Sequence, residues 1–298
     1  MMIPERFDVY CTSIPMLDEV AEWSLLRKWS LSEVYRASLP SGETRIVKWG
    51  GKEMAGEAAI YERLVSPLNI PSPVIYGYYE RDDSAVMVME DCGTFNLEQQ
   101  PRPELFLEAA KGLARLRDTA SANLGSLSEE ILRIYTVPAS HFLALLDDLL
   151  RSPRLSGNDV LLRLQGTFPT ELNKLYETAP LTLVHHDYHA KNLLIQGERI
   201  LPIDWSIAYL SPHLGDLYSL MHEAHSLSGI SKDDIITAFH EESRTGLTFE
   251  QLNWQLRIGG ICWLIKTLRW LVYGGTDIIP GSEAWIPDLM NDLDSLCQ

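Results

Sequence analysis

One short stretch of this chain places His, Asp and Asn at fixed intervals after an apolar segment. It reads His185-His186-Asp187-Tyr188-His189-Ala190-Lys191-Asn192, and Ile203-Asp204-Trp205 follows it. Between the two, residues 193–195 and 200–203 have the length and character of two short strands joined by a turn at Gly197. A loop followed by a hairpin would bring Asp187, Asn192 and Asp204 to face one point.

Two carboxylates and one amide that face one point fit a phosphoryl-transfer site. In such sites one carboxylate orients the acceptor hydroxyl, while an Asn and a second carboxylate hold the metal ion that bridges the nucleotide phosphates. Mg²⁺ takes oxygen ligands and keeps several waters, so few protein ligands suffice. Asp187 is therefore the expected catalytic residue, and Asn192 and Asp204 the expected Mg²⁺ ligands. Each residue alone would more often be a surface or capping group, and the joint pattern favours function.

The motif and its surroundings, from about Trp29 to Leu217, resemble the aminoglycoside phosphotransferase-like kinases, relatives of choline kinase and distant relatives of protein kinases. That family carries HGD-x-H-x-x-N followed by I-D-W, and this chain has His186 in place of the glycine. The resemblance implies an α+β, protein-kinase-like fold with a small strand-rich lobe and a larger, mainly helical lobe. We expect these lobes in residues 1–91 and 92–298, with a hinge at about 90–95. ATP or GTP and Mg²⁺ are the implied cofactors.

A lysine and a glutamate lie upstream in the order that the resemblance requires. Lys48 lies in the apolar segment 45–49, as does the phosphate-orienting lysine of protein-type kinases. Residues 53–65 have a helical pattern and include Glu57, which matches the family glutamate that pairs with this lysine. The alternative is that both charges are simply exposed to solvent, as most charges are.

The nucleotide base is expected beside the segment 85–91, an apolar strand that ends in acidic residues. By resemblance to the family's hinge, Met89 lies beside the adenine, and the backbone of Glu90 and Cys92 hydrogen-bonds the base. Any buried strand would give the same pattern, so this assignment rests on the resemblance.

The segment 29–36 occupies the place of a kinase glycine-rich loop and contains no glycine. The resemblance assigns phosphate binding here to the hydroxyls of Ser30 and Ser32 and to backbone N–H groups. Glu33 would be unfavourable beside phosphates unless it pairs or points away. The missing glycines keep open a second hypothesis, that of a catalytically inactive nucleotide-binding or regulatory protein.

Three further residues are expected to support or assist the catalytic loop. By resemblance, His185 packs under the loop and Asp216, in the Gly215-Asp216-Leu217 motif, accepts its backbone N–H groups. His189 matches the family histidine that approaches the γ-phosphate, and is a second catalytic candidate. Helix capping by Asp216 and a local hydrogen bond from His189 are the alternatives.

Acceptor-binding residues are expected in the helices that follow Asp216. The candidates are acidic, imidazole and indole side chains: His222, Glu223, Trp254, Trp263, Trp270 and Trp285. Acids would bind amines, and indole faces would bind quaternary ammonium groups. Core packing is the stronger alternative for the tryptophans at helical spacing.

Composition bounds the partners. The net charge of −16 argues against nucleic acid and anionic membranes and suits a cationic or polyhydroxylated acceptor, although acidity can also serve solubility alone. Four cysteines without metal or disulfide spacing, and no apparent leader, indicate a cytoplasmic protein. The apolar segment 258–273 is interrupted by Lys266 and Arg269, and so predicts a core helix rather than a membrane span.

The sequence therefore predicts an Mg²⁺-dependent kinase that phosphorylates a hydroxyl of a small molecule, with an aminoglycoside or an amino alcohol as the candidate acceptors. An atypical protein kinase is disfavoured because the gap between Trp205 and Gly215 is too short for a peptide-docking segment. Helical periodicity predicts helices in the second lobe at residues 103–119, 141–150, 159–176, 216–225, 232–242, 249–273 and 286–297.

Overall fold

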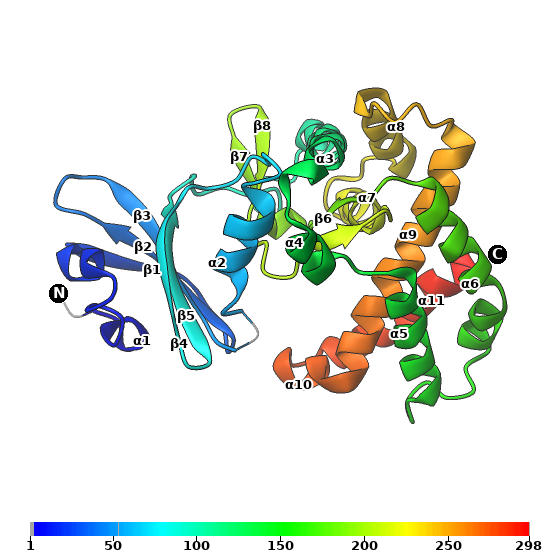
Figure 1. The fold of residues 1–298 in the computed structure, drawn as a ribbon, viewed down its shortest axis with the longest axis horizontal. Helices are drawn as coiled ribbons and strands as arrows, with labels where there is room; N and C mark the ends of the chain where they lie inside the picture. Colours follow the sequence, from blue (N-terminus) through cyan, green and yellow to red (C-terminus); the bar gives the residue numbers. More distant parts are fainter. Residues whose placement is uncertain (1–2, 53, 298) are drawn as a thin grey trace.

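The computed structural model describes residues 3–52 and 54–297, and it has the kinase-like two-part architecture expected from the sequence (Figure 1). An antiparallel sheet forms the N-terminal part, in the strand order β1-β2-β3-β5-β4. Its strands are β1 (Glu22–Lys28), β2 (Ser32–Ser38), β3 (Thr44–Gly50), β4 (Ile75–Arg81) and β5 (Ser84–Glu90). The chain then crosses to a mainly helical C-terminal part.

The two faces of this sheet have different partners because side chains alternate along each strand. Val47 and Val88 face outward and pack against the N-terminal segment that contains α1 (Glu5–Asp8). Met87 and Met89 face inward, beside α2 (Glu57–Ile60) and toward the helical part. Lys48 pairs with Met87 across the ladder and therefore shares the inward face.

The helix predicted at residues 53–65 is shorter at its start than expected. The α-helical turn α2 begins at Glu57, and a π-helical turn, Tyr61–Val65, continues it. Glu53 lies outside the described residues, and Met54 is in a turn. Glu57 and Ala58 are buried together with Leu64 and Val65, seven residues later, because residues at this spacing lie on the same side of a helix.

The helices of the C-terminal part are α3 (Pro103–Asn123), α4 (Glu129–Tyr135), α5 (Ala139–Arg151), α6 (Asp159–Thr178), α7 (Gly215–Ser228), α8 (Lys232–Glu242), α9 (Phe249–Trp270), α10 (Thr276–Ile278) and α11 (Trp285–Leu296). All the helices predicted from periodicity in this part are confirmed, with ends that differ by a few residues. Helix α9 stops at Trp270, earlier than predicted, because the following π turn breaks at Gly274 with φ of 128°. Helix α4 was not predicted.

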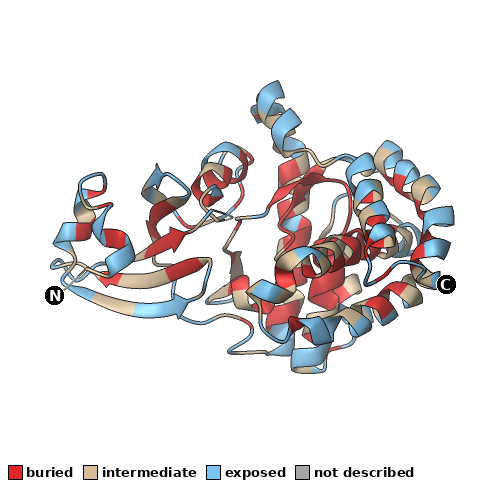
Figure 2. Ribbon diagram, turned by 90° about the horizontal axis from the view of Figure 1, so that it is seen from below, coloured by how far each residue is buried: buried red, intermediate tan, exposed pale blue. Residues whose placement is uncertain are grey.

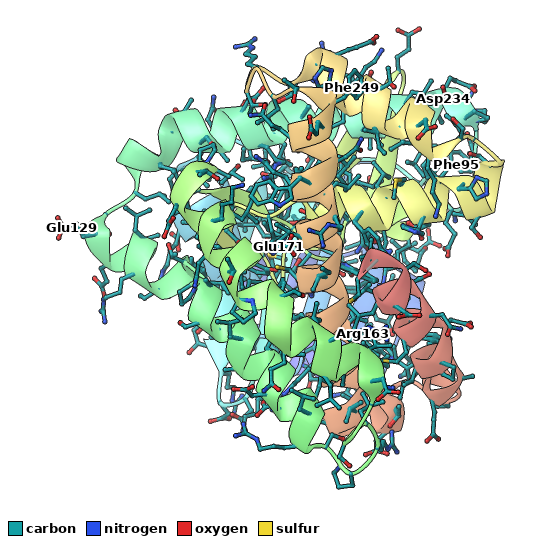
Figure 3. All side chains as sticks on the ribbon, turned by 90° about the vertical axis from the view of Figure 1, so that its right-hand side faces the viewer. Phe95, Glu129, Arg163, Glu171, Asp234 and Phe249 are labelled. Carbon is teal, nitrogen blue, oxygen red and sulfur yellow. The ribbon has the colours of Figure 1, made fainter. Side chains whose placement is uncertain are left out.

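Helix α9 lies at the centre of the helical part and packs against α5, α7 and α11 (Figures 1 and 2). Its buried residues include Ile258, Ile261 and Leu268. Charged side chains such as Glu129 and Arg163 lie on the outer side of this part and are exposed to solvent (Figure 3). No helix among residues 3–52 and 54–297 is both long and apolar enough to cross a membrane.

Two short ladders hold the polar motif between the sheet and the helices. Strand β6 (Thr182–Val184) pairs with β9 (Tyr209–Ser211), and β7 (Leu193–Gln196) pairs with β8 (Arg199–Pro202). The predicted hairpin is confirmed, with Gly197 in the left-handed region at φ of 64°. The segment that contains Asp187 and Asn192 thus runs from β6 to β7, and Asp204 follows β8.

A glycine on α9 sets how closely this helix approaches the β9–α7 connection. A Cβ atom added at Gly259 would lie 2.6 Å from backbone atoms of Leu214. That distance is below any ordinary contact, so no larger residue fits without moving the segment that leads into α7.

We expect Gly259→Ala to lower the free energy of unfolding by about 1–3 kcal/mol, because the added methyl group must push α9 away from Leu214. Gly166→Ala is the matched control, since its Cβ would meet no atom within 4 Å and Gly166 lies in the helix α6. It should raise stability by up to about 1 kcal/mol through helix propensity. Urea unfolding measures both, and equal stability of the two variants would contradict the packing argument.

Candidate active site

The loop between β6 and β7 holds Asp187 and Asn192 side by side. The Asn192 amide Nδ2 donates to Asp187 Oδ2 at 2.7 Å and to the Asp187 backbone carbonyl at 3.0 Å. Asn192 is buried, whereas Asp187 is partly accessible. These bonds use the nitrogen of the amide, so its oxygen is left to face away from Asp187.

A buried carboxylate holds the start of this loop. Asp216, at the first turn of α7, accepts the backbone N–H groups of His185 at 2.7 Å and of His186 at 2.8 Å. Burial raises the pKa of Asp216, although the neighbouring His185 and the two N–H groups act in the opposite direction. The bracing contact is therefore present, whereas the capping alternative is not, because the N-cap residue of α7 is Leu214 rather than Asp216.

His186 lies where the family motif has glycine. Its backbone conformation shows why glycine suits this position. Its φ is 68°, in the left-handed region that glycine adopts without strain. The imidazole is buried beside the Tyr209 ring, and its Nδ1 has no hydrogen-bond partner among the described residues. Burial lowers the pKa of His186 well below its usual value, so the side chain is neutral.

His185 connects the loop to the residue before Asp204. Its Nε2 donates to the Ile203 carbonyl at 3.0 Å, and its Nδ1 accepts the Asp187 N–H at 3.3 Å. The ring lies 4.4 Å from the Trp205 ring, and burial lowers its pKa. A neutral His185 thus ties Asp187 and Asp204 to one rigid support.

Two cations adjoin the Asp187 carboxylate. His189 Nε2 lies 3.4 Å from Oδ1, and Lys191 Nζ lies 3.4 Å from Oδ2. Burial would raise the pKa of Asp187, but the charges of His189 and Lys191 outweigh it and hold the pKa below its usual value. Asp187 is therefore ionised at neutral pH.

Glu223 contacts the same loop from α7. Its Oε2 accepts the Ala190 N–H at 2.6 Å and lies 3.5 Å from His189 Nδ1. Burial disfavours a charged His189, yet its hydrogen bond to the Glu223 carboxylate and the charges of Asp187 and Glu223 raise its pKa. Glu223, a candidate for acceptor binding, therefore also orients His189.

Lys48 joins the sheet to the helical part through two carboxylates. Its Nζ lies 2.5 Å from Glu57 Oε2 and donates to Asp204 Oδ1 at 2.9 Å. Lys48 and Glu57 are both buried, so the alternative that these charges are solvated is wrong. Burial raises the pKa of Glu57 to about 7, whereas for Asp204 the charge of Lys48 outweighs burial and lowers the pKa to about 2.

The oxygen atoms near Asp204 fit a hard cation such as Mg²⁺. Asp204 is ionised, φ of 66° turns it out of the extended backbone after β8, and the free amide oxygen of Asn192 is the second ligand expected. The described residues contain no group of three or more His, Cys, Asp or Glu side chains placed to hold a metal by themselves. A cation here would share its coordination with nucleotide phosphates and water.

The expected nucleotide end of the site lies where β5 leads into the helical part. Met89 is buried on the inward face of the sheet, and the Glu90 N–H donates to the Val74 carbonyl at 2.8 Å. Gln196 donates to the Cys92 carbonyl at 3.0 Å, while the Cys92 N–H has no partner among the described residues. That N–H and the Glu90 carbonyl are the groups expected to bind the base.

The glycine-free turn between β1 and β2 has a buried end and an exposed tip. Ser32 is buried at the first position of β2, and Ser30 is exposed at the turn. Glu33 pairs with Trp49 in the ladder and lies on the outward face, where Arg6 and Lys28 bind its carboxylate at 2.8 and 3.1 Å. Glu33 therefore points away from the phosphate side.

The candidates for acceptor binding differ in how close they lie to the catalytic loop between β6 and β7. Trp263 donates to the His186 carbonyl at 3.3 Å, and its ring lies 5.9 Å from that of His189. His222 stacks on Tyr218, donates to its carbonyl, and has a pKa lowered by burial.

The other three tryptophans contact other parts of the protein. Trp254 packs on the helical core beneath Lys174, and Trp270 lies where a Cβ on Gly275 would be. Trp285 is exposed at the start of α11. Trp263 contacts the catalytic loop, and the core-packing alternative holds for both Trp254 and Trp263, which pack against the helical core.

Sequence reasoning missed three basic residues of this region. Lys191 lies inside the motif, at a position where the family pattern accepts any residue. Lys266, whose Nζ lies 4.1 Å from the centre of the Tyr209 ring, has its pKa lowered to about 7 by burial. Its charge inside an apolar helix was the available signal. Arg27, at the end of β1, lies 4.0 Å from Asp204 Oδ2.

The comparisons with known proteins agree with the kinase-like fold. A model of the phosphotransferase enzyme family matches residues 39–244, well over half of the chain. The chain belongs to this phosphotransferase family. A search of curated proteins gives no match.

Solved structures with the same fold include other members of the phosphotransferase and kinase group. Aminoglycoside phosphotransferase APH(4)-Ia, in complex with ADP and hygromycin B, is 14% identical, with a TM-score of 0.67 over 97% of this chain and 98% of that chain. A choline/ethanolamine kinase family protein from Mesorhizobium loti is 17% identical, with a TM-score of 0.69 over 100% and 95%. Amicoumacin kinase hAmiN, in complex with AMP-PNP, Ca²⁺ and Ami, is 14% identical, with a TM-score of 0.65 over 97% and 94%.

We expect the buried pair Lys48–Glu57 to be strongly coupled in stability. Lys48→Met should lower the free energy of unfolding by about 3–5 kcal/mol, because it leaves two carboxylates without their shared cation. Glu57→Gln should cost less, since Lys48 keeps Asp204. The double variant should lose clearly less than both single losses together.

Denaturant unfolding of the four proteins measures the coupling. The exposed pair Arg102–Glu104 is the control, and its removal should change stability by less than about 1 kcal/mol. Strict additivity at Lys48 and Glu57 would show that the two side chains do not interact.

Proposed function

We propose that this protein transfers the γ-phosphate of ATP or GTP to a hydroxyl group of a small molecule. The observation that supports this most strongly is the convergence of Lys48 from the sheet with Asp204 beside the Asp187–Asn192 pair. An ionised carboxylate for the acceptor, an amide and a carboxylate for a metal, and a lysine for phosphates are the parts that phosphoryl transfer requires.

Each residue has a defined task in the proposed reaction. The acceptor oxygen attacks the γ-phosphorus, the bond from that phosphorus to the β–γ bridging oxygen breaks, and Asp187 takes the hydroxyl proton. Lys48, held by Glu57, orients the phosphates, and His189 stabilises negative charge on the transferred group. Most of the catalysis is then positioning and charge neutralisation. Asn192 and Asp204 would hold Mg²⁺, which when bound neutralises charge on the phosphates.

The acceptor is proposed to be a small polar molecule that is cationic or polyhydroxylated, such as an aminoglycoside or an amino alcohol. The net charge of −16 and the carboxylate of Glu223 beside the catalytic loop support this class. Hygromycin B in one neighbour, and the choline/ethanolamine kinase family of another, lie in the same chemical range. We place the protein in the cytoplasm, in line with its four free cysteines, and expect no nucleic-acid or membrane partner.

The second candidate is a nucleotide-binding protein without transfer activity. The turn without glycine between β1 and β2 favours it, because the usual backbone cradle for phosphates is missing. The Lys48–Glu57–Asp204 cluster and the Asp187–Asn192 pair oppose it, because an inactive protein has no need to keep both.

A nucleotide-consumption screen over aminoglycosides, choline, ethanolamine, sugars, homoserine and macrolides tests the proposal. We expect acceptor-dependent formation of nucleoside diphosphate. Asp187→Asn should lower kcat by about 10²–10⁴ and leave nucleotide binding intact, since it keeps the shape and removes the proton acceptor. Nucleotide binding without transfer to any acceptor class would favour the inactive candidate, and unchanged turnover of Asp187→Asn would refute the role of Asp187.

The acid limb of the pH–rate profile should depend on the two cations beside Asp187. Protonation of Asp187 removes activity at low pH, and the charges of His189 and Lys191 now hold its pKa low. His189→Gln and Lys191→Gln should therefore each raise that pKa and move the acid limb to higher pH. The measurement is kcat/KM from about pH 4 to 8. Lys174→Gln, on α6, should leave the limb in place, and a downward shift in either active-site variant would contradict the argument.

A further inference from the structure

A β-bulge in the hairpin that β1 and β2 form turns the side chain of Arg27 toward the candidate active site. Along β1 and β2, Leu25 pairs with Tyr35, but the next pair is Arg27 with Val34, so Leu26 is an extra residue. Without that extra residue Leu26 would face Val34, and Arg27 would face Glu33 on the outer side of the sheet. Bulges commonly re-aim a side chain in this way.

The bulge puts Arg27 in the same row as the phosphate-orienting lysine. Arg27 pairs with Val34, and Val34 pairs with Lys48 on the next strand. Residues directly opposite each other in a ladder point to the same face of the sheet. Two cations separated by one apolar residue therefore face the helical part together.

Lys48 and Arg27 approach different oxygens of the Asp204 carboxylate. Lys48 Nζ lies 2.9 Å from Oδ1, and an Arg27 amino group lies 4.0 Å from Oδ2. The Arg27 side chain is 43% exposed and its guanidinium also lies 5.4 Å from the centre of the Trp29 ring, so it reaches across open space to the carboxylate. A 4.0 Å separation at this exposure is a weak interaction that a better anion can replace.

The other basic side chains of the hairpin are engaged elsewhere. Lys28 and Arg6 bind Glu33 on the outward face of the sheet. Arg36 binds Asp91 at the end of β5 through Nε at 2.5 Å. Among the residues that the structure describes, Arg27 is thus the hairpin cation that faces Asp204 and has no carboxylate closer than 4.0 Å.

We propose that Arg27 binds the phosphates of the nucleotide, in place of the backbone N–H groups that a glycine-rich loop would supply. The inference rests on the proposed function, since it assumes a nucleotide beside Lys48 and Asp204. Asp204 and Asn192 would hold the metal ion, so Arg27, whose separation from Asp204 Oδ2 is 4.0 Å, would exchange this weak partner for phosphate oxygens. Guanidinium suits this task because it offers several N–H donors in a fixed plane.

Calorimetric binding of ADP and of adenosine, both with Mg²⁺, tests the inference. Arg27→Ala should weaken ADP binding by about tenfold or more, the loss expected for one charge-assisted hydrogen bond, and leave adenosine binding unchanged. Arg27→Lys should recover part of the loss because it restores the charge without the planar donors. Lys28→Ala is the matched control, one residue away on the outer face, and should bind both ligands as the wild type does.

Each other outcome overturns the inference in a recognisable way. ADP binding by Arg27→Ala at wild-type strength removes Arg27 from the phosphate site. An equal loss for ADP and adenosine assigns Arg27 to the base instead of the phosphates. An equal loss in Lys28→Ala assigns the effect to general surface charge. If the wild type binds neither ligand, the proposed function fails and this inference fails with it.

Discussion

The position of Lys48 between Glu57 and Asp204 is the interaction on which the active geometry depends. One ammonium group joins a strand, a helix and the segment after β8, so a buried ion-pair cluster links the sheet to the helical part beside their apolar contacts. Removing such charges from water is costly unless all partners are held in place. The inward face of the sheet, α2 and the β7–β8 hairpin are therefore constrained together.

A second set of contacts, made by residues of the helical part, keeps the catalytic loop rigid. Asp216 accepts two consecutive N–H groups, His185 bonds to the Ile203 carbonyl, and Gly259 lets α9 approach the segment that carries Asp216. The loop can then hold a left-handed residue at His186, a conformation that costs about 1–3 kcal/mol for a non-glycine residue unless its surroundings enforce it. Catalysis by positioning needs this kind of support, because small displacements of Asp187 are expensive in rate.

The helices of the second part were predictable because their apolar residues recur at helical spacing, and some of them begin at a recognisable cap. Helix α8 begins after Ser231, which accepts the Asp234 N–H, and α9 begins with a capping box formed by Thr248 and Gln251. Helix α4 was missed because it is short and has no buried residue, so its apolar pattern is weak. The end of α9 was placed too late because the apolar pattern runs past Trp270, whereas the backbone turns at Gly274. Periodicity describes which residues face a core, and it does not describe where the core ends.

The sequence by itself determined the motif spacing that brings Asp187, Asn192 and Asp204 together, since a short loop and a two-residue turn leave the chain few other paths. It also determined the alternation that places Lys48 on one face of a strand. Only the tertiary structure decided which face that is, that Glu33 points away from the site, and that a bulge at Leu26 turns Arg27 toward Asp204. Strand register and bulges arise from pairing between segments, and a one-residue shift moves every later side chain to the other face. That information does not exist in any single segment of the chain.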